Sequence, residues 1–444
     1  MTKTPIHSFL KEYKKESFVR LHMPGHKGVG ENAEDLDITE ISGADSLFEA
    51  SGIIEESERI AGEIYGAHTL YSTEGSSLSI RAMLYLVTLY AKKIGRTPKI
   101  AATRNAHKSF ISAAALIDFD IDWVSSKKSS YLSAMITTED IKAYFDTAKN
   151  LPVALYITSP DYLGYLSDIK GIAEICHKNG VLLIVDNAHG AYLKFLTPSL
   201  HPIDLGADMC CDSAHKTLPA LTGCAYMHIS KALPSFFYET AKRAMILFAS
   251  TSPSYLMLDS LDRLNPYLKE NFAEDLQIFV DKISDLKNKL SALGYTLTGN
   301  EPMKIAISSK EYGYLGGEIA DYLMEKGIVC EFADSDYLVL MPSPKNTDEE
   351  LQRLINALSA LKKKDKISNT PPVAHIPERK LSIREAMMSD FEIIRASECA
   401  ERIISSVTLG CPPAIPIAAP GEIADEKILS AFEYYGIDEC YVVK

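Results

Sequence analysis

A lysine in a polar turn offers the first reactive group in this sequence. Lys216 lies in the segment Ser213-Ala214-His215-Lys216-Thr217, between the apolar runs 181–185 and 223–229. A lone lysine in such a turn is usually a solvated side chain. Here, three other hydrogen-bonding side chains lie within four residues of the amine. This set suits an amine held beside an anionic group such as a phosphate.

An acidic residue upstream could act together with this lysine. Asp186 ends a strand-like run thirty residues before Lys216 and leads into Asn187-Ala188-His189-Gly190. A carboxylate at one strand end and a lysine after the next unit are what an aldehyde cofactor with a pyridine nitrogen requires. The lysine forms a Schiff base, and the carboxylate keeps the ring nitrogen protonated.

Three separated motifs resemble the ornithine/lysine/arginine decarboxylases, which are pyridoxal-phosphate (PLP) enzymes of fold type I. They are Met23-Pro24-Gly25-His26-Lys27-Gly28, Asp186-Asn187-Ala188-His189-Gly190 and Ser213-Ala214-His215-Lys216. The resemblance runs from about Leu21 to about Glu422 in the family's order. It implies that Lys216 holds PLP and that Asp186 faces the pyridine nitrogen. Since the first motif comes almost at once, we expect a short form without the extra N-terminal domain of longer members.

Composition and charge exclude several other classes. The chain has 444 residues, 46% hydrophobic and 24% charged, as in ordinary globular proteins. Its net charge of −13 argues against a nucleic-acid groove or an anionic membrane surface. The eight cysteines form no CxxC pair or zinc spacing, so we expect reduced thiols and no metal. Without an apolar signal core or a run of about 20 apolar residues, we expect a cytoplasmic protein with no membrane span.

Short apolar runs alternate with helical patterns from Lys99 onward, which predicts an α/β fold with a mostly parallel sheet. The expected strands are 100–103, 121–124, 153–158, 181–185, 209–211 and 225–229, with helices at 107–117, 138–146 and 169–178. Ligands bind at the carboxyl ends of such strands. The residues that follow expected strands are His107, Asp161, Asp186, His189 and Lys216.

The resemblance implies the fold class of a fold-type I PLP enzyme, in which helices enclose a mostly parallel seven-stranded-type sheet. Residues 1–50 would form an N-terminal helix, within 1–20, and an active-site loop, and 51–255 the PLP-binding large domain. Residues 256–361 would form a connecting helix (about 256–293) and a small α/β domain. The linker would be 362–380, and the C-terminal α+β domain 381–444. In the small domain we expect strands at 305–308, 329–331 and 337–340.

Gly75, Ser76 and Ser77 open a predicted helix, where free backbone N–H groups and the helix dipole favour a phosphate. An isolated Gly-Ser-Ser is more often a plain N-cap. The resemblance favours the phosphate, with Ser213 and His215 as further ligands. It also implies that His107 stacks on the cofactor ring and that Ser252 touches the phosphate of a neighbouring subunit in a homodimer or larger homo-oligomer. Without the resemblance, His107 would be a residue at a helix start and Ser252 part of a loop.

The resemblance implies decarboxylation of a basic amino acid to a polyamine-type amine and carbon dioxide, with arginine or lysine ahead of ornithine. His189 or Lys216 would return a proton to the carbon that lost carbon dioxide. A transaminase or another lyase is the alternative, although residues 295–361 contain a single arginine, Arg353, for a substrate carboxylate. A non-catalytic sensor is a third possibility.

A cationic substrate side chain needs an acidic partner, because an unpaired buried charge is costly. The candidates are Asp45, Asp161 and Glu422, each of which would otherwise be a solvated loop carboxylate. Asp161 and Asn187 depart from the residues expected in the family, so substrate identity is less well specified than the cofactor.

Overall fold

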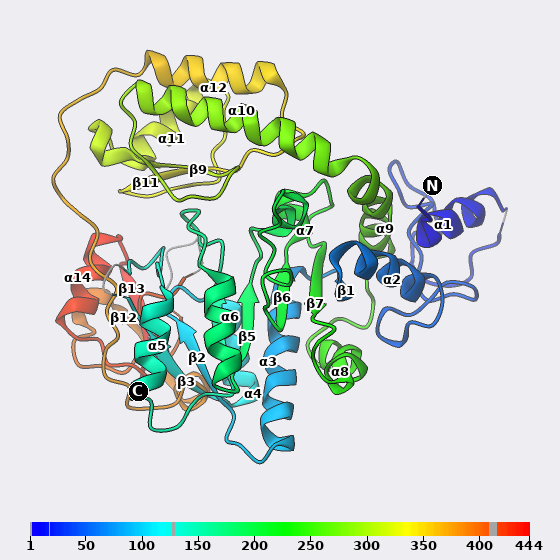
Figure 1. The fold of residues 1–444 in the computed structure, drawn as a ribbon, viewed down its shortest axis with the longest axis horizontal. Coiled ribbons are helices and arrows are strands. Elements are labelled where there is room, and N and C mark those ends of the chain that lie inside the picture. Colours follow the sequence, from blue (N-terminus) through cyan, green and yellow to red (C-terminus); the bar gives the residue numbers. More distant parts are fainter. Residues whose placement is uncertain (1, 17, 127–128, 408–414) are drawn as a thin grey trace. The chain divides into compact units, whose positions relative to one another are not determined.

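A computed structural model describes residues 2–16, 18–126, 129–407 and 415–444 (Figure 1). The chain forms two compact units, and each is discontinuous in sequence. The first contains Met1–Gly95 and Leu182–Gln277, and the second contains Arg96–Val181 and Ile278–Lys444. The sequence predicts five segments that are each continuous along the chain. The two units do not test this division, which stays a prediction.

Seven strands belong to the large sheet, and four of them lie in the first unit. Their order is β1 (His68–Ser72), β7 (Ala225–Ile229), β6 (Met209–Asp212) and β5 (Leu182–Asp186). The β5–β6 pair is parallel, whereas β7 is antiparallel to both of its neighbours. Almost every residue of these strands is buried, as expected for a sheet covered on both faces.

Helices of the first unit surround these strands. The helix α3 (Gly75–Lys93) packs against β6 and β7, and α2 (Ile53–Tyr65) packs against β1 and α9 (Tyr255–Glu270). The remaining helices of this unit are α1 (Pro5–Lys15), α7 (Ala214–Thr217) and α8 (Ser235–Ile246), with short 3₁₀ turns at Leu47–Glu49 and Ala191–Phe195.

The second unit contains the other three strands of the large sheet, which are parallel. Their order is β4 (Ala154–Thr158), β2 (Lys99–Thr103) and β3 (Asp120–Val124). Their connecting helices are α4 (Lys108–Ile117), α5 (Thr138–Thr147) and α6 (Ile169–Lys178). Together with the first unit, these strands confirm the predicted α/β class with a mostly parallel sheet.

Two smaller sheets complete the second unit. The strands β8 (Leu297–Thr298), β9 (Ile305–Ser308), β10 (Phe332–Ala333) and β11 (Tyr337–Leu340) form an antiparallel sheet in the order β10-β11-β9-β8. The strands β12 (Phe391–Arg395) and β13 (Glu439–Val443) form an antiparallel pair. Further helices of the second unit are α11 (Gly316–Glu325), α12 (Asp348–Ala360), α13 (Ile383–Met388) and α14 (Glu426–Tyr434).

The structure differs from the sequence prediction at several elements. The helix expected over 256–293 is two helices, α9 and α10 (Phe272–Ala292), with Asn271 between them. The apolar pattern continues across that break, so periodicity does not reveal it. The strand expected near 329–331 lies at Phe332–Ala333. Strand β1 and helix α8 were not predicted, and residues 410–414 of the C-terminal block lie outside the described residues.

Gly66 ends α2 in the left-handed conformation, with φ of 73°, as expected of a C-terminal cap. Within the described residues, no helix is both long enough and apolar enough to cross a bilayer.

Candidate active site

The structure brings Lys216 and His189 together. Lys216 belongs to the one-turn helix α7, which follows β6, and its side chain is exposed enough to be reached by a ligand. Its Nζ lies 2.9 Å from Nε2 of His189, which is in the turn after β5. A hydrogen bond between these two nitrogens requires one of them to be a donor and the other an acceptor. The pair can therefore hold and pass on a proton.

Asp186 lies at the carboxyl end of β5, three residues before His189. Its side chain is buried, and Oδ1 accepts from the backbone N–H of Ala188 at 3.2 Å and from the Cys211 thiol at 3.6 Å. The carboxylate is thus fixed in place in a site screened from water, where its charge acts strongly on a nearby cation.

The start of helix α3 has the geometry of an anion site. Gly75 has φ of +68°, and its N–H donates to the carbonyl of Gly223 at 2.8 Å. A Cβ atom built on Gly75 would meet nothing within 4 Å, so there is open space beside this turn. The N-cap is Glu74, and its side chain makes no capping bond. The backbone N–H groups of the first turn and the helix dipole therefore favour an anion here.

The hydroxyl groups predicted to bind the same phosphate meet one another. The Ser213 hydroxyl donates to Oγ of Ser76 at 2.9 Å, which joins the start of α7 to the start of α3. Ser76 and Ser77 are not the N-cap of α3, because that position is Glu74, and Ser213 is the N-cap residue of α7 but makes no side-chain capping bond. Ser77 is in the same turn and is partly exposed.

His215 and Thr217 complete the surroundings of Lys216. His215 donates from Nδ1 to the carbonyl oxygen of Cys224 at 3.0 Å, and burial lowers the pKa of its imidazole. The Thr217 hydroxyl is buried and has no hydrogen-bond partner among the described residues. An orphaned hydroxyl beside the reactive lysine, together with the open space at Gly75, fits a phosphorylated aldehyde cofactor.

Ser252 lies in an exposed turn between α8 and α9. Close to it, the backbone N–H of Ser250 donates to Glu74 Oε1 at 2.6 Å in the same chain. This contact holds the turn that contains Ser252 close to the Gly75 turn of the same chain. Ser252 could therefore act in the site of its own chain, and its role in a neighbouring subunit stays a prediction.

His107 lies in the second unit, as the N-cap of α4. Its Nδ1 accepts from the backbone N–H of Ser109 at 3.2 Å. His107 therefore lies at the start of a helix, as its neighbouring residues in the sequence indicate. Stacking on a cofactor ring stays a prediction.

The three carboxylates predicted for a substrate cation all have partners within their own unit. Asp45 is buried and accepts from backbone N–H groups at the start of α2, which include those of Gly52 at 2.8 Å and Ile54 at 3.1 Å. Asp161 accepts from the Ser133 hydroxyl and from the backbone N–H of Tyr165 at 2.9 Å.

Glu422 forms a fully buried ion pair with Arg104, with distances of 2.7 and 3.0 Å. None of the three is a solvated loop carboxylate. A substrate cation would have to compete with these contacts, so substrate recognition by any of the three stays a prediction.

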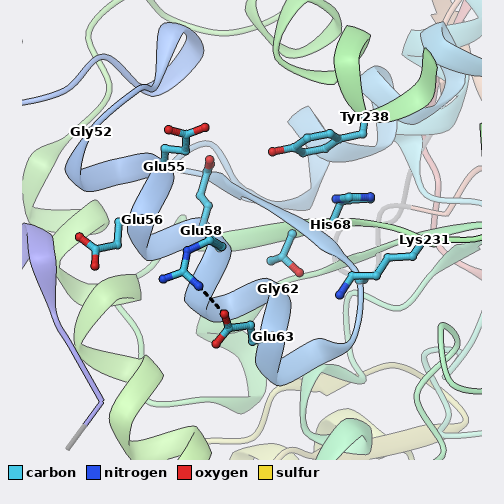
Figure 2. A pocket seen from close by; sticks show the side chains of 12 residues that line it. Gly52, Glu55, Glu56, Glu58, Gly62, Glu63, His68, Lys231 and Tyr238 are labelled. Atoms are coloured by element: carbon cyan, nitrogen blue, oxygen red, sulfur yellow. Dashed lines mark hydrogen bonds and ion pairs between the residues drawn. The ribbon is translucent and has the colours of Figure 1, made fainter. Parts of the chain in front are cut away.

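A pocket elsewhere in the first unit is unrelated to these residues. It has a volume of about 580 Å³ and lies beside α2 (Figure 2). Four glutamates contribute to its lining: Glu55, Glu56, Glu58 and Glu63. Glu58 pairs with Lys242 at 2.5 Å and Glu63 pairs with Arg59, so these two acidic groups have local partners. No residue predicted for the site lines this pocket.

Comparison with known proteins adds to this geometry. A family model described as "Orn/Lys/Arg decarboxylase, major domain" matches residues 4–309. The arginine decarboxylase of Halalkalibacterium halodurans is 30% identical over 464 aligned residues, which cover 96% of this chain and 92% of that protein. The arginine decarboxylase of Bacillus subtilis is 28% identical with the same coverage.

Solved structures share the fold. The lysine decarboxylase LdcF of Francisella novicida matches with a TM-score of 0.83 at 18% identity, over 99% of this chain and 81% of that chain. At this identity the likeness concerns the fold alone, and it confirms the fold class predicted from the sequence.

Proposed function

Because this chain belongs to the Orn/Lys/Arg decarboxylase family and is an amino-acid decarboxylase, we propose that it acts on arginine or lysine with PLP bound around Lys216. The observation that carries the proposal is the 2.9 Å contact between Lys216 Nζ and His189 Nε2. It lies within the turns that follow β5 and β6, and the buried carboxylate of Asp186 is at the end of β5.

Each of these residues has a distinct task. PLP, when bound, supplies an electron-poor ring that accepts the electrons left by departing carbon dioxide. The Lys216 amine holds the cofactor, and the Asp186 carboxylate keeps a proton on the ring nitrogen. His189 exchanges a proton with Lys216, so either residue can deliver a proton to the substrate carbon.

The first turn of α3 would hold the phosphate. Backbone N–H groups after Gly75 and the hydroxyls of Ser76, Ser77 and Ser213 offer donors there. The imidazole of His215 and the hydroxyl of Thr217, which has no hydrogen-bond partner among the described residues, lie within four residues of Ser213. His107 would cover the cofactor ring.

Cofactor attachment is tested by reducing the purified protein with borohydride and mapping the labelled peptide. The label should be on Lys216, since a Schiff base forms on an accessible amine. Lys194 and Lys242 are matched controls in the same unit, because each forms an ion pair with a carboxylate. A label on either of them would contradict the assignment.

The proposed substrate rests on the two relatives reported above, which are both named arginine decarboxylase. The test incubates the protein with arginine, lysine, ornithine or methionine and measures carbon dioxide and amine. Release from arginine or lysine ahead of ornithine is expected. Equal or faster turnover of methionine would show that no group recognises a distal cation.

We also propose a dimer in which the site needs a second copy of the chain. Apolar residues at the N-terminal side of the first unit are exposed, which is unusual for a surface without a partner. They are Phe18, Val19, Leu21, Met23 and Val29.

A further inference from the structure

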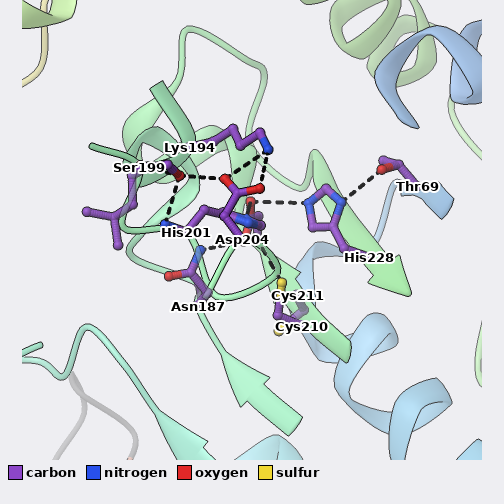
Figure 3. Close-up of polar contacts among 12 residues, drawn as sticks. Thr69, Asn187, Lys194, Ser199, His201, Asp204, Cys210, Cys211 and His228 are labelled. Carbon is purple, nitrogen blue, oxygen red and sulfur yellow. Dashed lines mark hydrogen bonds and ion pairs between the residues drawn. The ribbon is translucent and has the colours of Figure 1, made fainter. Parts of the chain in front are cut away.

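A buried carboxylate at the end of β6 has no part in the proposed chemistry. Asp212 is fully buried, and three side-chain N–H groups donate to it. Figure 3 labels the residues that carry these donors, Asn187, His201 and His228. Asn187 Nδ2 donates to Oδ1 at 2.7 Å, and the Nε2 atoms of His201 and His228 donate to Oδ2 at 3.1 and 3.2 Å. We refer to these four residues as the Asp212 cluster.

The hydrogen bonds of the two imidazoles are directed at this carboxylate. Nδ1 of His228 bonds with the Thr69 hydroxyl at 2.9 Å, while Nδ1 of His201 has no hydrogen-bond partner among the described residues. Although burial alone would raise the pKa of Asp212, the two imidazoles hold this pKa below its usual range. Asp212 is therefore an anion that three donors solvate in place of water.

The cluster lies directly behind the candidate active site. In the parallel β5–β6 pair, Asp186 is opposite Cys211, and their side chains meet at 3.6 Å. Successive side chains along a strand point to opposite faces of the sheet. The side chains of the next residues, Asn187 and Asp212, therefore meet on the other face. The backbone N–H of Asn187 also donates to the carbonyl of Cys211 at 3.0 Å.

The hydrogen bond between Asn187 and Asp212 joins the carboxyl ends of β5 and β6, and the reactive groups lie at these two strand ends. Asn187 directly follows Asp186, and Asp212 directly precedes Ser213, the first residue of the turn with Lys216. A shift of either end would change the distance between the Asp186 carboxylate and the Lys216 amine.

We propose that Asn187, Asp212, His201 and His228 are positioning residues that fix the strand ends bearing Asp186 and Lys216 at the spacing that the cofactor requires. This inference rests on the proposed function. Asn187 then acts as the donor that an anionic Asp212 requires, and an acidic residue at position 187 would need an uncharged partner at 212.

An exchange of the two side chains tests this pairing in the full-length protein. Asn187→Asp places two carboxylates at hydrogen-bond distance in a buried site, where like charges repel. Asp212→Asn removes the anion to which both imidazoles donate. Each single variant is expected to raise the dissociation constant for PLP about tenfold.

The double variant Asn187→Asp/Asp212→Asn has one carboxylate and one amide again, in reversed order. Its PLP affinity is expected to return to within about threefold of wild type, because neighbouring groups that share a bond are not additive. The free energy of unfolding of the cofactor-free protein should recover in parallel. The unfolding measurement needs no PLP, so it tests the pairing of Asn187 with Asp212 even if the proposed function is wrong. A wild-type protein that binds no PLP would contradict the proposed function alone.

Glu58→Gln is the matched control. It breaks a buried ion pair with Lys242 in the same unit, so it should lower stability and leave PLP affinity unchanged. Unchanged PLP affinity in both single variants, or a double variant no better than the worse single one, would overturn the proposal.

A stoichiometric metal ion would overturn it as well. Ligand atoms of His201, Cys210 and Asp212 lie within 4.8 Å of one another, a set that zinc can bind. One zinc per chain in the purified protein would make Asp212 a metal ligand in place of a hydrogen-bond acceptor.

Discussion

At the scale of single residues, Asp161 is a carboxylate in an unfavourable place for its charge. Burial raises its pKa to about 6, despite hydrogen bonds from Ser133 and Tyr165 and the nearby Lys304 ammonium, which lower it. Glu301 lies in the same unit, and burial raises its pKa to about 7. Folding therefore shifts both carboxyl groups towards the protonated form.

These two groups therefore contribute more to the stability of the folded protein at mildly acidic pH than at neutral pH. A carboxyl group with a raised pKa stabilises the folded state at low pH and loses this contribution as pH rises through the folded value. For Asp161 the loss between about pH 5 and about pH 7.5 is on the order of 1–2 kcal/mol. Asp161→Asn should reduce the difference in the free energy of unfolding between these pH values, measured by denaturant titration.

The amide keeps the shape of the carboxyl group, so Asp161→Asn should fold. Asp146→Asn, an exposed position in α5, is the control and should leave the difference unchanged. An equal pH dependence in wild type and Asp161→Asn would show that Asp161 does not titrate in this range.

At the scale of elements, the first turn of α3 is expected to determine cofactor retention. Ser76→Ala and Ser213→Ala should each weaken PLP binding, because each removes one charge-assisted hydrogen bond worth about 1.5–3 kcal/mol. The dissociation constant for PLP, from absorbance titration of the cofactor-free protein, measures the effect.

Ser79→Ala is the matched control on the same helix. The Ser79 hydroxyl is buried and has no hydrogen-bond partner among the described residues, so its removal should leave PLP affinity unchanged. Equal PLP affinity in wild type, Ser76→Ala and Ser213→Ala would indicate that this turn binds no phosphate.

Elements whose pattern is local were predictable from the sequence. The six apolar runs from 100 to 229 all correspond to strands within one or two residues, because strands of a sheet covered on both faces read as continuous apolar segments. Strand β1 was missed because its sequence, His-Thr-Leu-Tyr-Ser, is half polar, and Thr69 is accommodated by a bond to His228 that is distant in sequence.

Candidate site residues were predictable where they follow such strands. Lys216 and His189 were both predicted, although their 2.9 Å contact depends on the pairing of β5 with β6. The partners of Asp45, Asp161 and Glu422 were not predictable. Glu422, for example, meets Arg104 across 318 positions of sequence, and no local pattern encodes such a pair.

At the scale of the whole molecule, the proposed dimer predicts complementation between two inactive chains. Lys216→Ala removes the reactive amine, and Ser252→Arg blocks the turn predicted to reach a neighbouring site. If Ser252 acts across an interface, mixing the two variants assembles one intact site per mixed dimer, and activity should return to part of the wild-type level.

Each variant incubated alone is the control, and sedimentation of the mixture shows whether mixed dimers form. Mixed dimers without activity would place Ser252 in its own chain's site, in agreement with the contact between Ser250 and Glu74.

The discontinuity of the first unit has a consequence for biosynthesis. His68 of β1 pairs with Ile229 of β7, and Gly75 is bonded to Gly223. Both contacts can form only after the ribosome has synthesised residues 223–229, about 150 residues later. At typical translation rates this delay is on the order of 10–30 s. During that time the first strand and α3 leave the ribosome without their partners. A nascent chain that stops before residue 223 already contains Asp186 and Lys216 but lacks Gly223, which bonds to the Gly75 turn. If PLP binds as proposed, we expect newly made protein to bind it only after β7 has emerged.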